Sequence, residues 1–205
     1  MGSGLAITYL AQLAAQPGRP NSRLHFVDAP SRAPVSFTLG ITLDRKMEHA
    51  SFVIRTAKAG DAEEICELWK EAVALAGQYE PVFRPSDTAV PHFRDFLLEH
   101  LRLESSLVIV AQSNWRLVGY CIATTERYDG YYQPCKYGYV ADLNVAARHR
   151  RSGIGSALLE KTKQWCVANS ISRLEVSASS KNPLATEFWN SRGFHTYFET
   201  KCLEL

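Results

Sequence analysis

The sequence predicts an α/β (α+β) domain built on one mixed β-sheet. Three observations support this class. Strand-like and helix-like patterns alternate from about residue 51 to the end of the chain. Two neighbouring strand patterns, 106–112 and 116–126, are joined by the short turn Ser-Asn-Trp, which indicates an antiparallel hairpin. Other strand patterns are separated by a helical segment, and this connection is typical of parallel pairing.

The predicted elements follow one another without long gaps. They are strand 51–57, helix 61–77, helix 91–102, strands 106–112 and 116–126, loop 128–135, strand 137–146, helix 153–170, strand 172–179, helix 183–192 and strand 194–205. The strands are recognised by runs of β-branched and aromatic residues. The loop is marked by Asp-Gly and Gln-Pro, which favour turns.

Each helix is justified by its apolar period and by its end signals. Helix 61–77 has one apolar face and is expected to end at Gly77, and helix 91–102 is opened by Pro91. Helix 153–170 follows a glycine-rich turn. The last helix has Asn182 as its N-cap, Pro183 at the first helical position and Gly193 as its terminator. The face of the first helix consists of Ala62, Ile65, Leu68, Trp69, Ala72 and Leu75.

The first 50 residues differ in character from the rest. Segments 15–23 and 28–34 are rich in Pro, Gly and Ser and show no sustained period. Met47 stands just before the first clear strand. We therefore expect residues 1–50 to be a leader, disordered or accessory, and residues 51–205 to form the functional domain. The strand-like segment 35–43 leaves a packed N-terminal element open, and Arg19 and Arg23 leave a mitochondrial presequence open.

Composition excludes several classes of function. The chain has 205 residues, 46% of them hydrophobic, and a formal net charge of +2, which is too small to indicate nucleic-acid binding. No apolar run reaches the length of a membrane span, so no membrane partner is expected. The five cysteines are scattered and have no zinc-site spacing, so no metal is expected and a cytoplasmic location with reduced thiols is favoured. They are Cys66, Cys121, Cys135, Cys166 and Cys202.

The segment 148–156, RHRRSGIGS, points to an anion site. A helix N-terminus offers free N–H donors and a partial positive charge, and Gly153 and Gly155 permit close approach of a ligand. Arg148, Arg150 and Arg151 add positive charge beside it. The segment lacks the Lys-Ser/Thr of a Walker loop and the third glycine of a dinucleotide fingerprint. Taken alone, it is equally compatible with an ordinary helix-start turn and a solvated basic cluster.

Three segments in order resemble the GNAT superfamily of acetyl-CoA-dependent N-acetyltransferases. RRSGIG at 150–155 is similar to its Arg/Gln-x-x-Gly-x-Gly/Ala motif, and VADLNV at 140–145 to its cofactor-side strand. NPLATEFWNSRGF at 182–194 is similar to its Asn-x-x-Ala-x-x-Phe-Tyr-x-x-x-Gly-Phe segment. The resemblance implies a GNAT-like mixed, splayed central sheet with helices on both faces, and acetyl-CoA as co-substrate.

The resemblance also implies a cofactor site. The backbone N–H groups of residues 151–156 would hold the coenzyme A pyrophosphate, and the backbone of residues 143–145 would pair with the pantetheine arm. Asn182 would contact the arm from the other side, alongside its role as a helix cap. The cofactor-binding candidates are Leu143, Asn144, Val145, Arg150, Arg151, Ser152, Gly153, Ile154, Gly155, Ser156 and Asn182.

The implied reaction is direct attack of a primary amine on the thioester in a ternary complex. Deprotonating such an amine at pH 7 costs roughly 4–5 kcal/mol, so a base or a water relay helps. Asp142 is the candidate base, acting through water, and the Val145 N–H is the oxyanion donor implied by the resemblance. The family often carries Glu where this chain has Ala141, so a purely structural carboxylate at Asp142 stays open, with Glu126 and Asp129 as further candidates for the base.

A second departure from the family concerns the general acid. The usual Tyr is replaced by Trp189, whose indole cannot transfer a proton at neutral pH. A thiol leaving group has a pKa of about 8.5 and needs little help to depart. Tyr139, Tyr197 or solvent are the candidate proton donors.

The aromatic segment before the cofactor-side strand is predicted to face the acceptor. Tyr128, Tyr131 and Tyr132 could surround an ammonium group, with Asp129 beside them. Aromatic loop packing or a contact between two subunits of a homodimer is an equally open interpretation. The sequence thus predicts an N-acetyltransferase for a small-molecule or protein amine, with a non-catalytic acyl-CoA-binding module as the alternative.

Overall fold

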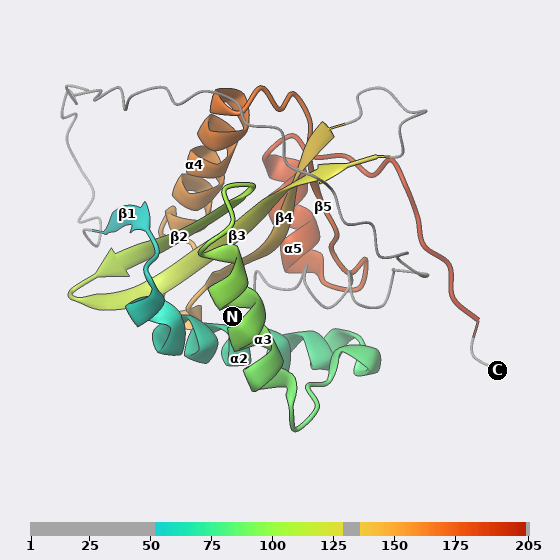
Figure 1. Cartoon of the computed structure of the whole chain (residues 1–205). Helices are drawn as coiled ribbons and strands as arrows, with labels where there is room; N and C mark the ends of the chain where they lie inside the picture. The colour runs from blue at the N-terminus through green and yellow to red at the C-terminus, as the bar shows by residue number, and fades with distance from the viewer. Residues whose placement is uncertain (1–51, 129–135, 204–205) are drawn as a thin grey trace.

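The computed structural model describes residues 52–128 and 136–203 (Figure 1). The predictions for residues 1–51, and those for Asp129, Tyr131 and Tyr132, concern residues outside this described part. The elements are β1 (Val53–Thr56), η1 (Ala59–Asp61), α2 (Ala62–Tyr79), η2 (Pro81–Phe83), α3 (Ala89–His100), β2 (Ser106–Ser113), β3 (Arg116–Arg127), β4 (Lys136–Val145), η3 (Ala147–His149), α4 (Ile154–Ala168), β5 (Leu174–Val176) and α5 (Pro183–Ser191).

The sheet is mixed, which confirms the predicted class. Its strands lie in the order β1-β2-β3-β4-β5; the first three pairings are antiparallel and β4 pairs with β5 in parallel. The β2–β3 hairpin turns at Asn114 and Trp115, whose φ angles are 47° and 65°. Positive φ at both central residues is the geometry of a two-residue hairpin that matches the twist of the strands.

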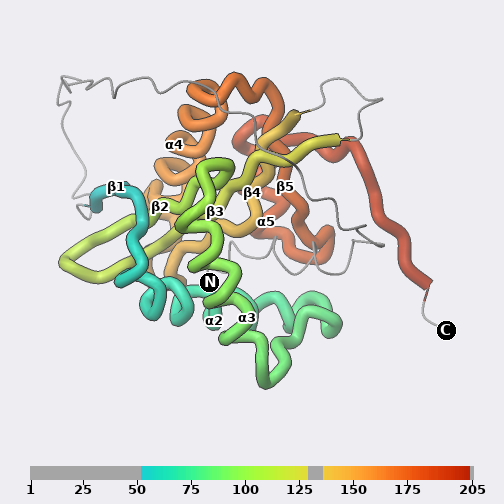
Figure 2. Tube along the Cα trace, in the orientation of Figure 1, coloured from blue at the N-terminus to red at the C-terminus, as the bar shows by residue number. Residues whose placement is uncertain are grey.

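Helices cover both faces of the sheet. Figures 1 and 2 show α2 and α3 grouped apart from α4 and α5. On the α2/α3 face, Trp69 stacks on Phe93 with ring centroids 4.4 Å apart, and both pack with Tyr120 and Ile122 of β3. A second core, on the α4/α5 face, includes Ile109, Cys121, Leu143, Val145, Ile154, Leu158, Leu159, Ala185 and Trp189. The two cores therefore lie on opposite faces of one sheet.

Helix α4 lies close against the centre of the sheet. A Cβ atom on Gly119 of β3 would stand 2.9 Å from the Asn144 carbonyl oxygen and 3.3 Å from the Ile154 side chain. Only glycine fits this approach without displacing its neighbours. The packing fixes the start of α4 beside the end of β4, which is where the candidate anion site was predicted.

Several predicted boundaries differ from the structure. Helix α2 passes Gly77 and ends at Tyr79, because Glu80 is extended before Pro81, as residues preceding proline usually are. Helix α3 begins at Ala89, which places Pro91 inside the first turn, where its missing N–H has no helical partner to lose.

The predicted strand at 194–205 is wrong over its described part. Residues 194–203 form no strand, and α4 and β5 are shorter than predicted. The residue types suggested a strand, but β5 is only three residues long and offers a short edge. Side-chain contacts hold the segment instead, as described below.

Candidate functional site

Strand β4 separates from β5 partway along its length. The two strands pair only at Gly138↔Leu174, Tyr139↔Glu175 and Val140↔Val176, while β4 continues to Val145. Beyond Val140 the edge of β4 that faces β5 therefore has no strand partner among residues 52–128 and 136–203. Unpaired N–H and C=O groups on such an edge can receive an extended ligand as an added strand.

A β-bulge in β4 lies at this point of separation. Val140 pairs with Ala123 and Asp142 pairs with Ile122, so Ala141 is the extra residue. Bulges bend the strand that contains them and increase its twist. The sequence did not signal the bulge, because nothing in VADLNV marks an extra residue.

The backbone of Val145 faces the open edge. The Ala146 N–H donates to the Val118 carbonyl of β3 at 2.9 Å, and successive strand residues direct their polar groups to opposite edges. The Val145 N–H and C=O consequently point away from β3. The C=O accepts a hydrogen bond from the Nε atom of Arg150 at 2.9 Å.

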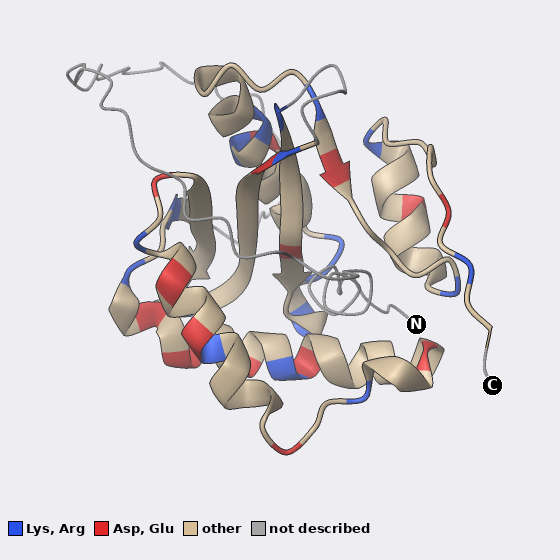
Figure 3. Cartoon of the chain, turned by 45° about the vertical axis from the view of Figure 1, so that its right-hand side comes forward, with Lys and Arg blue, Asp and Glu red and all other residues tan. Residues whose placement is uncertain are grey.

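The N-terminus of α4 lies next to this edge and is suited to an anion. Gly153, its N-cap, has φ of 86°, and the preceding turn contains Arg151 with φ of 65°. The first intrahelical donor is the Ala157 N–H, which donates to the Gly153 carbonyl at 3.0 Å. The N–H groups of residues 154–156 have no helical acceptor. The first turn carries no acidic side chain, and Figure 3 shows acidic residues gathered on α2 and α3 instead.

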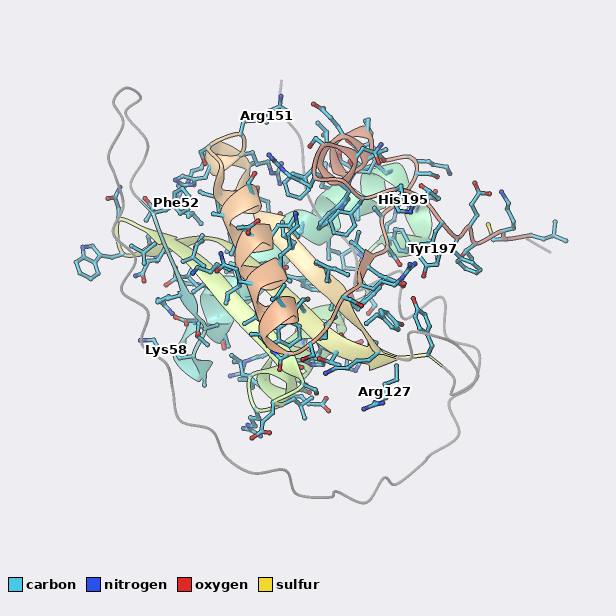
Figure 4. The ribbon with its side chains drawn as sticks, turned by 90° about the horizontal axis from the view of Figure 1, so that it is seen from above. Phe52, Lys58, Arg127, Arg151, His195 and Tyr197 are labelled. Carbon is cyan, nitrogen blue, oxygen red and sulfur yellow. The ribbon has the colours of Figure 1, made fainter. Side chains whose placement is uncertain are left out.

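The two arginines of the motif are used differently. The Arg150 side chain is only 9% exposed; its Nη2 atom lies 3.5 Å from Glu71 of α2, and burial lowers its pKa although Glu71 raises it. The Ala147 N–H also donates to Glu71, at 2.7 Å. Arg151 is exposed at the start of α4 and lies 3.7 Å from Glu187 of α5 (Figure 4). Arg150 thus fastens the turn to α2 and β4, and Arg151 stands at the surface.

Two of the predicted cofactor-binding residues are buried asparagines. The Asn144 Nδ2 atom donates to the Leu68 carbonyl of α2 at 2.7 Å, which ties β4 to the helix. The Asn182 Oδ1 atom accepts from the N–H groups of Leu184 and Ala185, both at 3.2 Å, which confirms its role as the N-cap of α5. Such a cap stabilises a helix by about 1 kcal/mol. Among the described residues, no hydrogen bond engages the Asn182 side-chain nitrogen.

Asp142 is a buried carboxyl on the α2/α3 face of β4. It is 2% exposed, and its Oδ2 atom accepts a hydrogen bond from the Tyr120 hydroxyl at 2.9 Å. Within residues 52–128 and 136–203 its Oδ1 atom is buried without a hydrogen-bond partner. Burial raises the pKa of Asp142 to about 7, against the opposing effect of the Tyr120 hydrogen bond. A group with this pKa exchanges its proton readily at neutral pH.

Trp189 and the candidate proton donor Tyr139 lie on different faces of the sheet. Trp189 is 6% exposed in the α4/α5 core, in edge-on contact with Phe188 and Phe194 at 5.0 Å each. Tyr139 belongs to the α2/α3 core; its hydroxyl donates to Ser177 at 2.9 Å, and burial raises its pKa. Trp189 is therefore a packing residue in the position where the family carries a tyrosine.

A polar aromatic cluster surrounds Glu175 of β5, a residue that the sequence analysis did not single out. Its carboxylate accepts hydrogen bonds from Tyr128, Tyr197 and Arg173. The ring of Tyr128 stacks on Tyr137 of β4, with centroids 4.3 Å apart. The one available signal was a charged residue inside the otherwise apolar strand LEV. Of the four predicted acceptor-side residues, only Tyr128 can be located, and it belongs to this cluster.

Residues 52–128 and 136–203 contain no group of three or more His, Cys, Asp or Glu side chains arranged to hold a metal ion. None of the helices in those residues has both the length and the apolarity to cross a bilayer.

Known structures share this fold. A tetramutant of the BH1408 protein from Bacillus halodurans has a TM-score of 0.67 and 21% identity, over 75% of this chain and 99% of that one. The aminoglycoside antibiotic 6'-N-acetyltransferase AAC(6')-IG from Acinetobacter haemolyticus has a TM-score of 0.60 and 18% identity, over 75% and 97%. The aminoglycoside N-acetyltransferase AAC(6')-Iy, in complex with CoA, has a TM-score of 0.59 and 15% identity, over 76% and 95%.

The sequence itself matches a protein family. Residues 65–194 match the model of the Acetyltransferase (GNAT) family, and this segment contains the open edge of β4, the start of α4 and the Asn182 cap. The match spans more than half of the residues. The chain therefore belongs to the acetyltransferase (GNAT) family.

Proposed function

We propose that the protein transfers an acetyl group from acetyl-CoA to a primary amine, by direct attack within a ternary complex. One observation carries this proposal: the unpaired edge of β4 ends beside the free N–H groups of α4. An extended chain with an anionic group at one end, such as pantetheine with its pyrophosphate, fits both features. Membership of the family supports the same ligand.

The cofactor would be held mainly by backbone groups. We propose that the N–H groups of residues 151–156 bind the pyrophosphate, and that the edge formed by residues 143–145 pairs with the pantetheine arm. The nitrogen of Asn182 would donate from the opposite side. Arg150 would hold the turn in place through its contacts with the Val145 carbonyl and Glu71. Arg151 would add positive charge at the surface.

The Val145 N–H is the proposed oxyanion donor. It lies on the open edge, and the Arg150 hydrogen bond to its carbonyl restrains the peptide group. A preorganised donor of this kind contributes about 3–4 kcal/mol to barrier lowering in other acyl-transfer enzymes. The thiolate can leave with a proton from solvent, since its own pKa is about 8.5. The Tyr139 hydroxyl is bonded to Ser177 and lies roughly 20 Å along β4 from Val145, and the Tyr197 hydroxyl is held by Glu175, the partner of Tyr139 in the sheet.

Asp142 is the proposed general base, acting through a water at its Oδ1 atom. That atom is buried and has no partner among the described residues, while Oδ2 is held by Tyr120. A carboxyl with a pKa of about 7 is matched to proton transfer at neutral pH. Glu126 and Asp129 are the alternatives, because Ala141 stands where the family often carries Glu.

The acceptor is proposed only as an amine, on a small molecule or a protein. Two of the similar structures are aminoglycoside acetyltransferases, so aminoglycosides belong among the acceptors to be tested. We further propose that residues 51–205 carry the activity and that it takes place in the cytoplasm, where the free cysteines stay reduced.

The proposal is tested by separating binding from turnover. Calorimetry should show that acetyl-CoA binds, and release of CoA thiol should then accelerate in the presence of at least one amine. The amines are kanamycin, spermidine, a lysine-containing peptide, a peptide with a free N-terminus and a free amino acid. Binding without acetylation of any amine would instead support the non-catalytic acyl-CoA-binding module.

A further inference from the structure

We propose that Glu175 is a positioning residue for the acceptor amine, because it fastens the segment 194–203 and the end of β3 to β5 and so fixes the acceptor-facing wall. This inference rests on the proposed function. It adds a residue that neither the sequence motifs nor the family match indicates.

Both oxygens of Glu175 are engaged by residues from different parts of the chain. The Oε2 atom accepts a hydrogen bond from the Tyr197 hydroxyl at 2.6 Å. The Oε1 atom accepts one from the Tyr128 hydroxyl and one from the Nε atom of Arg173, the latter at 2.5 Å. The Arg173 guanidinium lies 4.3 Å from the centre of the Tyr197 ring. One carboxylate therefore links three segments.

The position of Glu175 places this link beside the opening of the sheet. Glu175 pairs with Tyr139, one register step before the Val140↔Val176 pair where the two strands separate. Paired residues of parallel strands share a face, so Glu175 lies on the α2/α3 face, as Tyr139 and Ala141 do. Val145 is six residues beyond Tyr139, roughly 20 Å along the strand. Glu175 is thus too far away to touch the reacting carbonyl, but it borders the face from which an amine would approach Asp142.

The segment that Glu175 holds, residues 194–203, contains neither helix nor strand. Tyr197 and Phe198 are 57% and 72% exposed. Figure 4 shows His195 and Tyr197 on the stretch that follows α5. The family match ends at residue 194, so Tyr197 lies just beyond the matched residues. Segments that a rigid scaffold positions in this way commonly determine specificity.

The cluster stays charged at neutral pH. Burial raises the pKa of Glu175, but hydrogen bonds from Tyr128, Tyr197 and Arg173 outweigh this effect and leave the pKa below its ordinary value. Hydrogen bonds to an ionised group are about twice as strong as neutral ones. The link is therefore present under the conditions in which the enzyme would act.

Two variants separate this role from general stability. Tyr197→Phe removes the hydroxyl but keeps the ring that Arg173 covers, and Glu175→Gln removes the charge. Glu199→Gln is the matched control, since Glu199 lies on the same segment and pairs only with the exposed Lys201 among the described residues. For each variant, acetyl-CoA affinity is measured by calorimetry, and KM and kcat are measured with the best acceptor among kanamycin, spermidine and a lysine-containing peptide.

We expect acceptor KM to rise about tenfold in Tyr197→Phe and in Glu175→Gln, the effect of losing one hydrogen bond to a charged group. Acetyl-CoA affinity and kcat should stay within about twofold, and Glu199→Gln should match the wild type. An unchanged acceptor KM would overturn the inference, as would a parallel loss of acetyl-CoA affinity. If the wild type binds acetyl-CoA but acetylates no amine, the proposed function itself fails and this inference falls with it.

Discussion

The Nε atom of Arg150 donates a hydrogen bond to the backbone carbonyl of Val145 at 2.9 Å. This contact joins the glycine-rich turn to the end of β4, so the proposed pyrophosphate and oxyanion sites are parts of one rigid unit. Glu71 of α2 completes it by accepting from the Ala147 N–H and lying 3.5 Å from Arg150. The motif arginine therefore acts on the backbone that would bind the cofactor.

Replacing Arg150 should weaken both binding and turnover. Arg150→Lys keeps the positive charge but loses the planar fork that reaches Val145 and Glu71 together. We expect kcat/KM for acetyl-CoA to fall about tenfold, the equivalent of 1.4 kcal/mol. Steady-state kinetics measure this change. Arg148→Ala is the control, because Arg148 is exposed in the same turn, and an equal loss in both variants would refute the structural role of Arg150.

Gly153 should tolerate no side chain. Its φ of 86° is left-handed, and a residue with a Cβ pays roughly 1–2 kcal/mol to adopt it. Gly153→Ala should lower the free energy of unfolding by about that amount and weaken acetyl-CoA binding, as seen in urea titration and calorimetry. Gly60→Ala is the control, since a Cβ meets no atom within 4 Å at either position but only Gly153 has a left-handed φ. Unchanged acetyl-CoA affinity in Gly153→Ala would show that this turn does not bind the cofactor.

Asp142 should make stability depend on pH in a defined direction. Its folded pKa of about 7 lies above the unfolded value of about 3.9. Between these values the folded protein binds a proton that the unfolded chain does not, so stability falls as pH rises from about 4 to about 7. Asp142→Asn cannot ionise and should lose this slope.

Urea unfolding at about pH 5 and about pH 8 measures the effect of Asp142 on stability. Relative to the wild type, the Asp142→Asn variant should be more stable at about pH 8 than at about pH 5. Asp95→Asn is the control, because Asp95 is exposed on α3. A difference that does not change with pH would show that Asp142 is ionised throughout.

Asp142→Asn should also remove the acidic limb of the pH–rate profile. The proposed base must be ionised to accept a proton, so wild-type kcat should rise through an apparent pKa near 7. The variant should be about a hundredfold slower at neutral pH and flat across this range. If the profile keeps its limb, the proton acceptor is another group, and Glu126 is the next candidate to replace.

Trp189→Tyr should alter turnover modestly and leave cofactor affinity similar. Trp189 packs in the α4/α5 core against Phe188 and Phe194, so its smaller aromatic substitute keeps most of the contact. The phenol could add a proton donor, but a thiolate needs little help to leave. Calorimetry and initial rates test this, and a hundredfold loss of coenzyme A affinity would contradict it.

Local patterns predicted most of the fold. The hairpin, the helix faces and the Asn182 cap each depend on neighbouring residues, and the structure contains all three. The segment 194–203 was predicted as a strand because of its local strand character, yet strand formation also needs an edge to pair with. β5 supplies only three residues, and side chains hold the segment instead.

Contacts between distant residues could not be predicted. Arg150 reaches Glu71 across 79 residues, and Tyr120 meets Asp142 through a strand register that the bulge at Ala141 shifts. In the sequence Glu175 is a single charged residue in a short strand. In the structure its carboxylate accepts hydrogen bonds from Tyr128, Arg173 and Tyr197. Family motifs indicated the proposed cofactor side, whereas the proposed acceptor-facing wall depends on contacts between distant residues.

The central claim is acetyl transfer by direct attack in a ternary complex, and initial-rate kinetics test it most directly. Acetyl-CoA and the best amine of the panel are varied together, and acetylated amine and free CoA are both quantified. The account predicts equal amounts of the two products and intersecting double-reciprocal lines. Acetyl-CoA binding without acetylated product, or parallel lines that indicate an acetyl-enzyme, would contradict it.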